Sequence, residues 1–231
     1  MANDSYAVKD SDREGGAPGM KLFSPDSKFM RFMSTLGDLM LLNFIFLLCS
    51  LPVVTIGASL TALYTVVFRI VREKDSRGVL AQFFESFRQN FRRAAGIWLI
   101  LLPVGALLVL DLLLFSGVTG VMRWLSVVFL LLLLLVLFTA GYAFPLLSQF
   151  ENGVKTTLKN ALFLSLGYLP RTLAVTALNV LPFALLFLNL YLFLYVGFIW
   201  IFLYFSAAAY LNAKTLEKVF APYREKEEEK T

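Results

Sequence analysis

Residues 127–144, VVFLLLLLLVLFTAGYAF, decide the fold class of this chain. No residue of this run carries a charge, and most of its residues are Leu, Val or Phe. Uncharged apolar runs of about 18 residues or more match the thickness of a lipid bilayer rather than the interior of a soluble domain. The run therefore predicts a helix that crosses a membrane.

The composition of the whole chain agrees with this interpretation. Of the 231 residues, 58% are apolar and 16% are charged, against roughly 45–50% and 25% in ordinary soluble domains. The charged residues gather at the two ends of the chain and in short islands between apolar runs. We therefore expect an all-α integral membrane protein with short cytoplasmic amphipathic helices.

Apolar length and charge predict about six transmembrane helices. The uncharged stretch 172–212 would measure about 62 Å as one helix, twice the hydrocarbon thickness of roughly 30 Å, so we expect it to fold back near Asn189. The spans together occupy residues 32–213, between a polar, partly disordered N-terminal segment (1–31) and a charged cytoplasmic tail (214–231). We expect the Glu-rich end of this tail, residues 225–230, to be disordered. The expected spans are residues 34–51, 58–71, 95–114, 122–147, 172–188 and 190–212.

The distribution of basic residues predicts the orientation of these spans. If the N-terminus is cytoplasmic, all of the 21 Lys and Arg residues except Arg123 fall on the cytoplasmic side. Such an asymmetry is typical of multi-pass membrane proteins, and it predicts that both termini are cytoplasmic. Because the basic residues flank apolar spans, the net charge of +5 indicates a lipid bilayer as the partner and not a nucleic acid. Residues 1–19 lack the apolar core of a cleavable signal peptide.

The segment Leu80–Arg93 predicts an amphipathic helix on the cytoplasmic side. Its large apolar residues recur at helical spacing, which suits either the membrane interface or a groove on a partner protein. Residues 154–166 show a weaker pattern of the same kind. The candidate partner-docking face of the first helix consists of Phe83, Phe84, Phe87, Phe91, Arg88 and Arg92.

Four polar residues within the expected spans are candidates for function, namely Asp38, Asn43, Asp111 and Asn179. Ionisable residues inside a membrane are energetically unfavourable and often functional. Structural roles are also open, because Asp38 and Asp111 lie near span ends, and Asn side chains often form hydrogen bonds between helices. A polar path lined by Asp38, Asn43 and Asp111 is therefore one hypothesis.

The sequence offers no catalytic centre. It contains no His, its one cysteine is Cys49 inside an apolar run, and it lacks a Gly-rich phosphate loop with Lys. These are the residues that most often bind metals, transfer protons or hold phosphates. We therefore expect no enzyme activity, no metal site and no cofactor.

Several motifs resemble those of a known group of proteins. LGDLMLLN (36–43), CSLPVVTIGA (49–58), ALY (62–64) and FRQNF (87–91) resemble sequences of the YesL-like family of bacterial integral membrane proteins. The likeness continues through LKNA (158–161) and LPRT (169–172). It implies a multi-pass protein of the bacterial cytoplasmic membrane.

The YesL-like family has no established biochemical activity, and its members are typically encoded beside genes for carbohydrate ABC uptake. The resemblance implies a non-enzymatic role accessory to carbohydrate ABC uptake or to its regulation. The partners would be ABC transporter subunits or a second copy of the chain. The alternative is a small transporter or channel in its own right, which would use the polar path described above.

Overall fold

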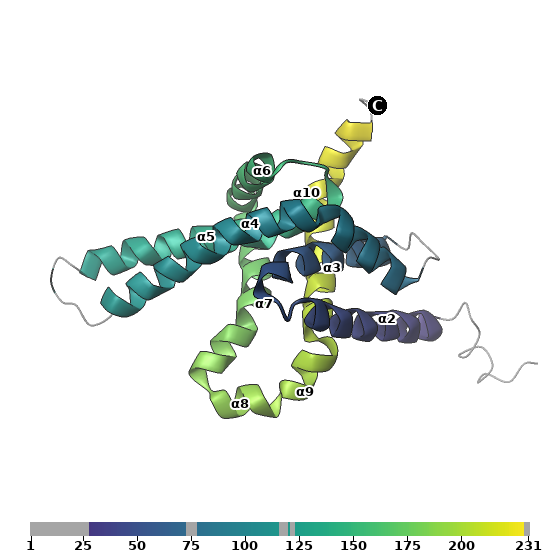
Figure 1. Cartoon of the computed structure of the whole chain (residues 1–231), viewed down its shortest axis with the longest axis horizontal. Helices are drawn as coiled ribbons and strands as arrows, with labels where there is room; N and C mark the ends of the chain where they lie inside the picture. The colour runs from purple at the N-terminus through teal and green to yellow at the C-terminus, as the bar shows by residue number, and fades with distance from the viewer. Residues whose placement is uncertain (1–27, 73–77, 116–119, 121–122, 229–231) are drawn as a thin grey trace, which may run out of the picture. The chain divides into compact units, whose positions relative to one another are not determined.

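The computed structural model describes residues 28–72, 78–115, 120 and 123–228, and every regular element in these residues is helical (Figure 1). The predicted all-α fold is confirmed. The elements are α2 (Lys28–Cys49), the 3₁₀-helix η1 (Val53–Thr55), α3 (Ile56–Val71), α4 (Val79–Phe115), α5 (Arg123–Gln149), α6 (Val154–Gly167), α7 (Leu169–Leu188), α8 (Leu190–Tyr195), α9 (Gly197–Ile199), the π-helix η3 (Trp200–Tyr204) and α10 (Phe205–Glu228).

Five helices of the described residues are long and apolar enough to cross a membrane. They correspond to the first five expected spans, because length and hydropathy alone determine these elements. The five candidate spans are Phe29–Cys49, Val53–Val71, Val79–Phe115, Arg123–Gln149 and Leu169–Leu188.

The region expected as the sixth span is not one continuous helix. The expected turn at Asn189 is confirmed, since this residue has an extended backbone (φ −155°, ψ 95°) after the end of α7. Residues 190–204 then form α8, α9 and η3 in succession before α10 begins (Figure 1). Gly197 and the many aromatic residues lower the helix propensity of this stretch.

The tail also differs from the expectation. Residues 214–228 belong to α10 and are helical, which includes residues 225–228 of the end that was expected to be disordered. Buried Leu216, Val219 and Phe220 pack on the core, which explains why this polar segment is ordered. Residues 1–27 of the expected N-terminal segment lie outside the described residues.

The chain forms two compact units, residues 1–38 and 39–231. The described part of the first unit is helical and consists of the beginning of α2. In the second unit, α3 packs against α4, α5 and α10. Gly57 is required at the α3–α4 contact, because a Cβ atom at this position would lie 2.6 Å from the carbonyl oxygen of Ala94. Small residues allow such close packing between helices in membranes.

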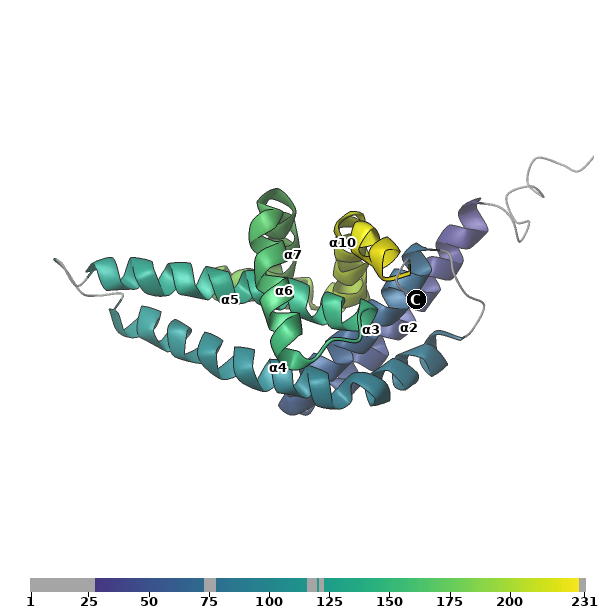
Figure 2. The same ribbon diagram turned by 90° about the horizontal axis from the view of Figure 1, so that it is seen from above.

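Helices α4 and α5 lie side by side in both views of the molecule (Figures 1 and 2). α4 contains 37 residues, and its length of about 55 Å exceeds the hydrocarbon thickness of about 30 Å. Residues 95–115 alone match that thickness, so residues 79–94 extend beyond it. The amphipathic helix and the third span, which we expected as separate helices, are therefore one helix.

Candidate functional site

A polar cavity of about 290 Å³ lies where the last turns of α3 and α5 meet the beginning of α4. Most of its lining is polar, in contrast to the apolar surface of the spans. The lining residues are Thr65, Arg69, Gln82, Glu85, Ser86, Gln89, Asn90, Arg93, Leu147, Ser148, Gln149, Phe150 and Glu151.

A chain of hydrogen bonds fixes the wall of this cavity. The Thr65 hydroxyl donates to the carbonyl oxygen of Thr61 (3.0 Å), and its oxygen lies 2.7 Å from the Ser86 hydroxyl oxygen. Because the single Thr65 proton is used within α3, the Ser86 hydroxyl donates to Thr65. Asn90 Nδ2 then donates to Ser86 Oγ (3.3 Å). The chain holds α4 at a defined rotation against α3.

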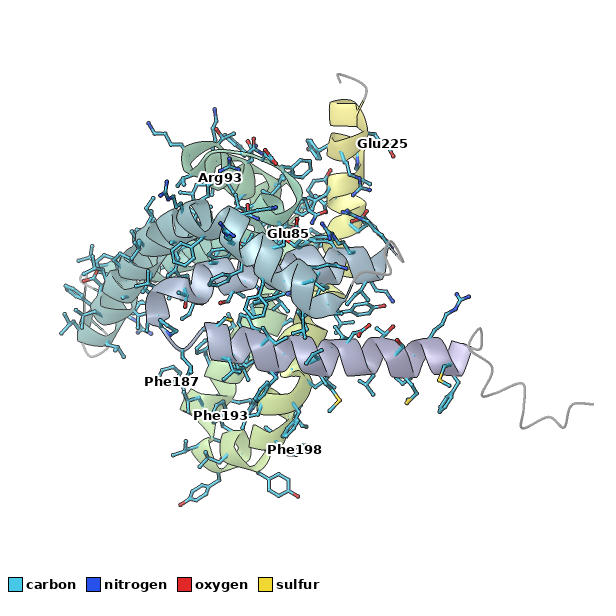
Figure 3. All side chains as sticks on the ribbon, turned by 45° about the vertical axis from the view of Figure 1, so that its right-hand side comes forward. Glu85, Arg93, Phe187, Phe193, Phe198 and Glu225 are labelled. Atoms are coloured by element: carbon cyan, nitrogen blue, oxygen red, sulfur yellow. The ribbon has the colours of Figure 1, made fainter. Side chains whose placement is uncertain are left out.

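The charged residues of the cavity balance one another. Arg69 and Arg93 are positive, whereas Glu85 and Glu151 are negative. Figure 3 shows Glu85 and Arg93 above the aromatic residues Phe187, Phe193 and Phe198, which lie in the lower part of the view. In the part of the chain that the structure describes, Glu85, Arg93 and Glu151 form no ion pair. The lining thus offers groups of both signs to a ligand.

An ion-pair network beside the cavity attaches α10 to α3 and α5. Arg72, directly after α3, donates to both carboxylate oxygens of Glu217, the shortest contact being 2.7 Å. Arg224 donates to Glu217 Oε1 (2.9 Å), and Arg72 also donates to Gln149 Oε1 (2.5 Å). Gln149 therefore belongs both to this network and to the cavity lining.

The network determines the protonation state of Glu217. Burial by itself would raise the pKa of the Glu217 carboxyl. The hydrogen bonds from Arg72 and Arg224, together with their positive charges, outweigh burial and hold this pKa below its ordinary value. Glu217 is therefore ionised at neutral pH.

Asn43 in α2 connects this helix with the π-helix η3. Its Nδ2 donates to the carbonyl oxygens of Trp200 (3.1 Å) and Ile201 (2.7 Å), and its Oδ1 accepts from the backbone N–H of Ser206 (3.0 Å). A π-helix disturbs the regular α-helical hydrogen-bond pattern, and buried backbone groups need partners. The fully buried Asn43 side chain supplies partners for three such groups.

Asn179 also makes a contact between helices. Asn212 Nδ2 in α10 donates to Asn179 Oδ1 in α7 (3.0 Å) and to the Tyr64 hydroxyl in α3 (3.2 Å). Asn43 and Asn179 thus make the interhelical hydrogen bonds that are common for Asn in membrane helices.

The two acidic candidates are placed differently. Asp38 belongs to the unit of residues 1–38, and Asp111 lies partly exposed in the second half of α4. Neither Asp38 nor Asp111 lines the polar cavity, and the same is true of Asn43 and Asn179. The polar site is thus built by residues other than the four intramembrane candidates.

The structure corrects part of the expected docking face. Phe83 has an exposed fraction of 0% and stacks on Phe87 inside the protein, so it is not available to a partner. Phe87 and Phe91 are partly buried against the core. Phe84 remains 51% exposed. The four phenylalanines lie within about 100° of the helix circumference. The edge of this stripe that contains Phe83 packs on the protein, whereas the edge that contains Phe84 is exposed.

Two open hollows lie on the exposed side of the same segment. The first, of about 620 Å³, is lined by Phe84, Glu85, Arg88 and Gln89. The second, of about 440 Å³, is lined by Phe87, Arg88, Gln89, Phe91, Arg92 and Arg93. Arg88 and Arg92 are exposed, so both hollows present cationic groups next to phenylalanine rings.

None of the cavity residues was among the candidates predicted from the sequence. Their signal is a polar stripe at four-residue spacing, with Gln82, Ser86 and Asn90 on α4 and Thr65 and Arg69 on α3. These stripes indicate faces that meet each other, whereas we expected the segment Leu80–Arg93 at the membrane interface or in a groove on a partner. In the described residues, no group of three or more His, Cys, Asp or Glu is placed to hold a metal ion.

The chain matches one protein family model from the second half of α2 to the second half of α4. Residues 39–112 match the family described as "Protein of unknown function, DUF624". The chain is also 32% identical over 149 residues to the uncharacterized protein YteU of Bacillus subtilis (strain 168). The aligned residues make up 63% of this chain and 66%, slightly less than two thirds, of YteU. No solved structure matches the chain significantly. These matches support a relationship between this chain and the DUF624 family of unknown function.

Proposed function

We propose that this chain is a non-enzymatic membrane protein that assists a carbohydrate ABC transporter of the bacterial cytoplasmic membrane or regulates it. The carbohydrate context rests on the resemblance of its motifs to the YesL-like family. The structural support is the first part of α4, residues 79–94, which extends beyond the length needed to cross the bilayer.

The first part of α4 has the properties of a docking surface. One side is fixed to the protein through buried Phe83 and through the Ser86–Thr65 hydrogen bond. The other side exposes Phe84, Arg88 and Arg92 beside two hollows. A fixed surface loses little conformational freedom on binding, and exposed aromatic and Arg side chains are enriched in protein interfaces.

The chemistry of this surface favours a particular kind of partner. Phenylalanine rings beside arginines suit an amphipathic helix that carries apolar and acidic residues. We propose that this helix belongs to a cytoplasmic segment of the transporter's membrane subunit.

The transporter or channel alternative has less support. Its proposed path requires a polar side chain of Asn43 that is available to a substrate. The Asn43 amide already contacts three backbone groups of residues 200–206 and is fully buried. We therefore place Asn43 in helix packing and retain the accessory role.

Site-specific photo-crosslinking in the native host tests the proposal. A photoreactive amino acid would replace Phe84 in the docking surface or, as a matched control, Leu107, which is 61% exposed in the apolar half of α4. Under carbohydrate induction, we expect a crosslink to a transporter subunit from position 84 and none from position 107.

Two results would contradict the accessory role. One is the absence of any transporter subunit among the products from position 84 under inducing conditions. The other is a product that consists only of two copies of this chain. The double variant Phe84→Ala/Arg88→Glu should lose the crosslinked partner in co-purification, whereas Leu107→Ala should keep it.

A further inference from the structure

The polar cavity is lined by charged residues of both signs. Among the described residues, Arg93, Glu85 and Glu151 form no ion pair, and all three line the cavity together with the carboxamides of Gln82, Gln89, Asn90 and Gln149. The lining therefore presents a cationic group beside anionic groups. It fits a ligand that carries a negative and a positive group a short distance apart.

The position of the cavity indicates an amphiphilic ligand. Arg69 lies in the last turn of α3, and Gln149 is the last residue of α5, so the cavity lies at the ends of two spans, where lipid headgroups are found. Glu85 and Gln89 line both the cavity and the hollow that contains Phe84. A polar headgroup in the cavity would therefore have an apolar surface beside it.

We propose that the polar cavity binds a phosphoethanolamine group, supplied by a phosphatidylethanolamine lipid. Glu85 and Glu151 accept hydrogen bonds from the primary ammonium, and Arg93 contacts the phosphate. The carboxamide nitrogen of Gln89 donates one N–H to Glu85 Oε1 (3.3 Å) and has a second N–H for the phosphate.

The ammonium group distinguishes this ligand from other common phospholipids. The choline group of phosphatidylcholine has the same charge but no N–H donor, so it leaves the two carboxylates without hydrogen bonds. Phosphatidylglycerol has the phosphate but lacks a cation. A ligand that displaces water from the two carboxylates without replacing its hydrogen bonds binds much more weakly.

The test uses the purified full chain in detergent micelles that contain phosphatidylethanolamine, phosphatidylcholine or phosphatidylglycerol. Thermal unfolding is followed by the reactivity of Cys49, the one cysteine of the chain, and bound lipid is counted by native mass spectrometry. We expect phosphatidylethanolamine to raise the unfolding midpoint about 3 °C more than either other lipid.

Matched variants locate the effect in the cavity. Glu151→Gln and Arg93→Gln change exposed cavity residues and should each abolish the preference for phosphatidylethanolamine. Glu225→Gln and Arg123→Gln make the same chemical changes at exposed positions outside the cavity and should keep it.

The outcomes separate the possible sources of the ligand. Soluble phosphoethanolamine that protects the chain equally well in phosphatidylcholine micelles would assign the same site to a free metabolite. Equal midpoints in all three lipids would overturn the proposal, as would an unchanged preference in Glu151→Gln. The docking surface is tested separately by crosslinking from position 84, so failure of one proposal does not entail failure of the other.

Discussion

Two regions of the 39–231 unit are stabilised in different ways. We call the cavity residues together with Arg72, Glu217 and Arg224 the polar layer, and residues 186–202 the aromatic segment. In the polar layer, side chains from α3, α4, α5 and α10 are connected by directional hydrogen bonds and ion pairs. In the aromatic segment, Phe187, Tyr191 and Tyr195 are 85%, 87% and 87% exposed.

The difference reflects the surroundings of each region. Polar groups that leave water need protein partners, so the polar layer specifies its own geometry. Apolar and amphipathic aromatic side chains at a membrane surface are satisfied by lipid, so the aromatic segment needs few contacts within the protein. Asn43 provides the main polar attachment at the end of this segment, where it binds the backbone of η3 and Ser206.

Among the changes that test the contrast between these two regions, Asn43→Leu should have the largest effect. It removes the partner of two carbonyl groups and one N–H, and the contacts to Trp200 and Ser206 are buried. We therefore expect a loss of about 3 kcal/mol in unfolding free energy. Denaturant unfolding in detergent measures this loss. The control Asn189→Ala removes an exposed cap of α8 and should cost about 0.5–1 kcal/mol. Equal effects of the two changes would show that Asn43 does not attach the segment.

A smaller effect is expected from Glu217→Gln in the polar layer. The change leaves Arg72 and Arg224 without their shared counter-ion. Because the side chain of Glu217 is 21% exposed, solvent screens part of this interaction, and we expect a loss of about 1 kcal/mol. Glu225→Gln changes an exposed residue of the same helix. Its unfolding free energy, measured with a chemical denaturant, should lie within about 0.5 kcal/mol of that of the unchanged protein.

The contribution of Glu217 should depend on pH. Its pKa is lowered in the folded protein from an ordinary value of 4.5, so the unfolded chain binds a proton before the folded chain does as the pH falls. The stabilisation is therefore complete above about pH 4.5 and disappears as the pH falls through the lower folded pKa. The stability difference between the unchanged protein and Glu217→Gln, measured against pH, should narrow in acid. A difference that widens in acid would contradict the ion-pair network.

The smallest effect is expected from Phe187→Ala in the aromatic segment. Because this side chain is 85% exposed within the protein, its loss in detergent should change the unfolding free energy by at most about 0.5 kcal/mol. Phe220→Ala, at a position with an exposed fraction of 0%, should cost about 3–5 kcal/mol in the same assay. A large loss for Phe187→Ala would mean that the aromatic segment packs on protein.

The sequence predicted the first five spans because they depend on local properties, namely apolar length and hydropathy. The turn at Asn189 followed from the same argument, since residues 172–212 are too long for one crossing. The helical breaks in residues 190–204 were not predicted. They include a π-helix, two of whose carbonyl groups accept hydrogen bonds from Asn43. Because Asn43 lies more than 150 positions away in the sequence, no local pattern reveals this contact.

The candidate site was predicted only in part. We separated residues 80–93 from the next span because of their charges, although no proline lies between Val79 and Leu102 to end the helix. The burial of Phe83 was missed because the four phenylalanines form one stripe of about 100°, and the sequence does not show which edge of this stripe packs on the protein. The polar cavity combines residues of α3, α4 and α5, so it exists only after these helices have packed.

The polar layer and the aromatic segment should lie on opposite sides of the membrane, which cysteine labelling can measure. In a Cys49→Ala background, single cysteines would be introduced by Arg88→Cys at the exposed side of α4 or by Tyr195→Cys in the aromatic segment, and labelled with a membrane-impermeant maleimide. We predict that position 195 is labelled in intact cells and that position 88 is labelled only after the membrane is disrupted. Labelling of both positions from the same side would contradict it.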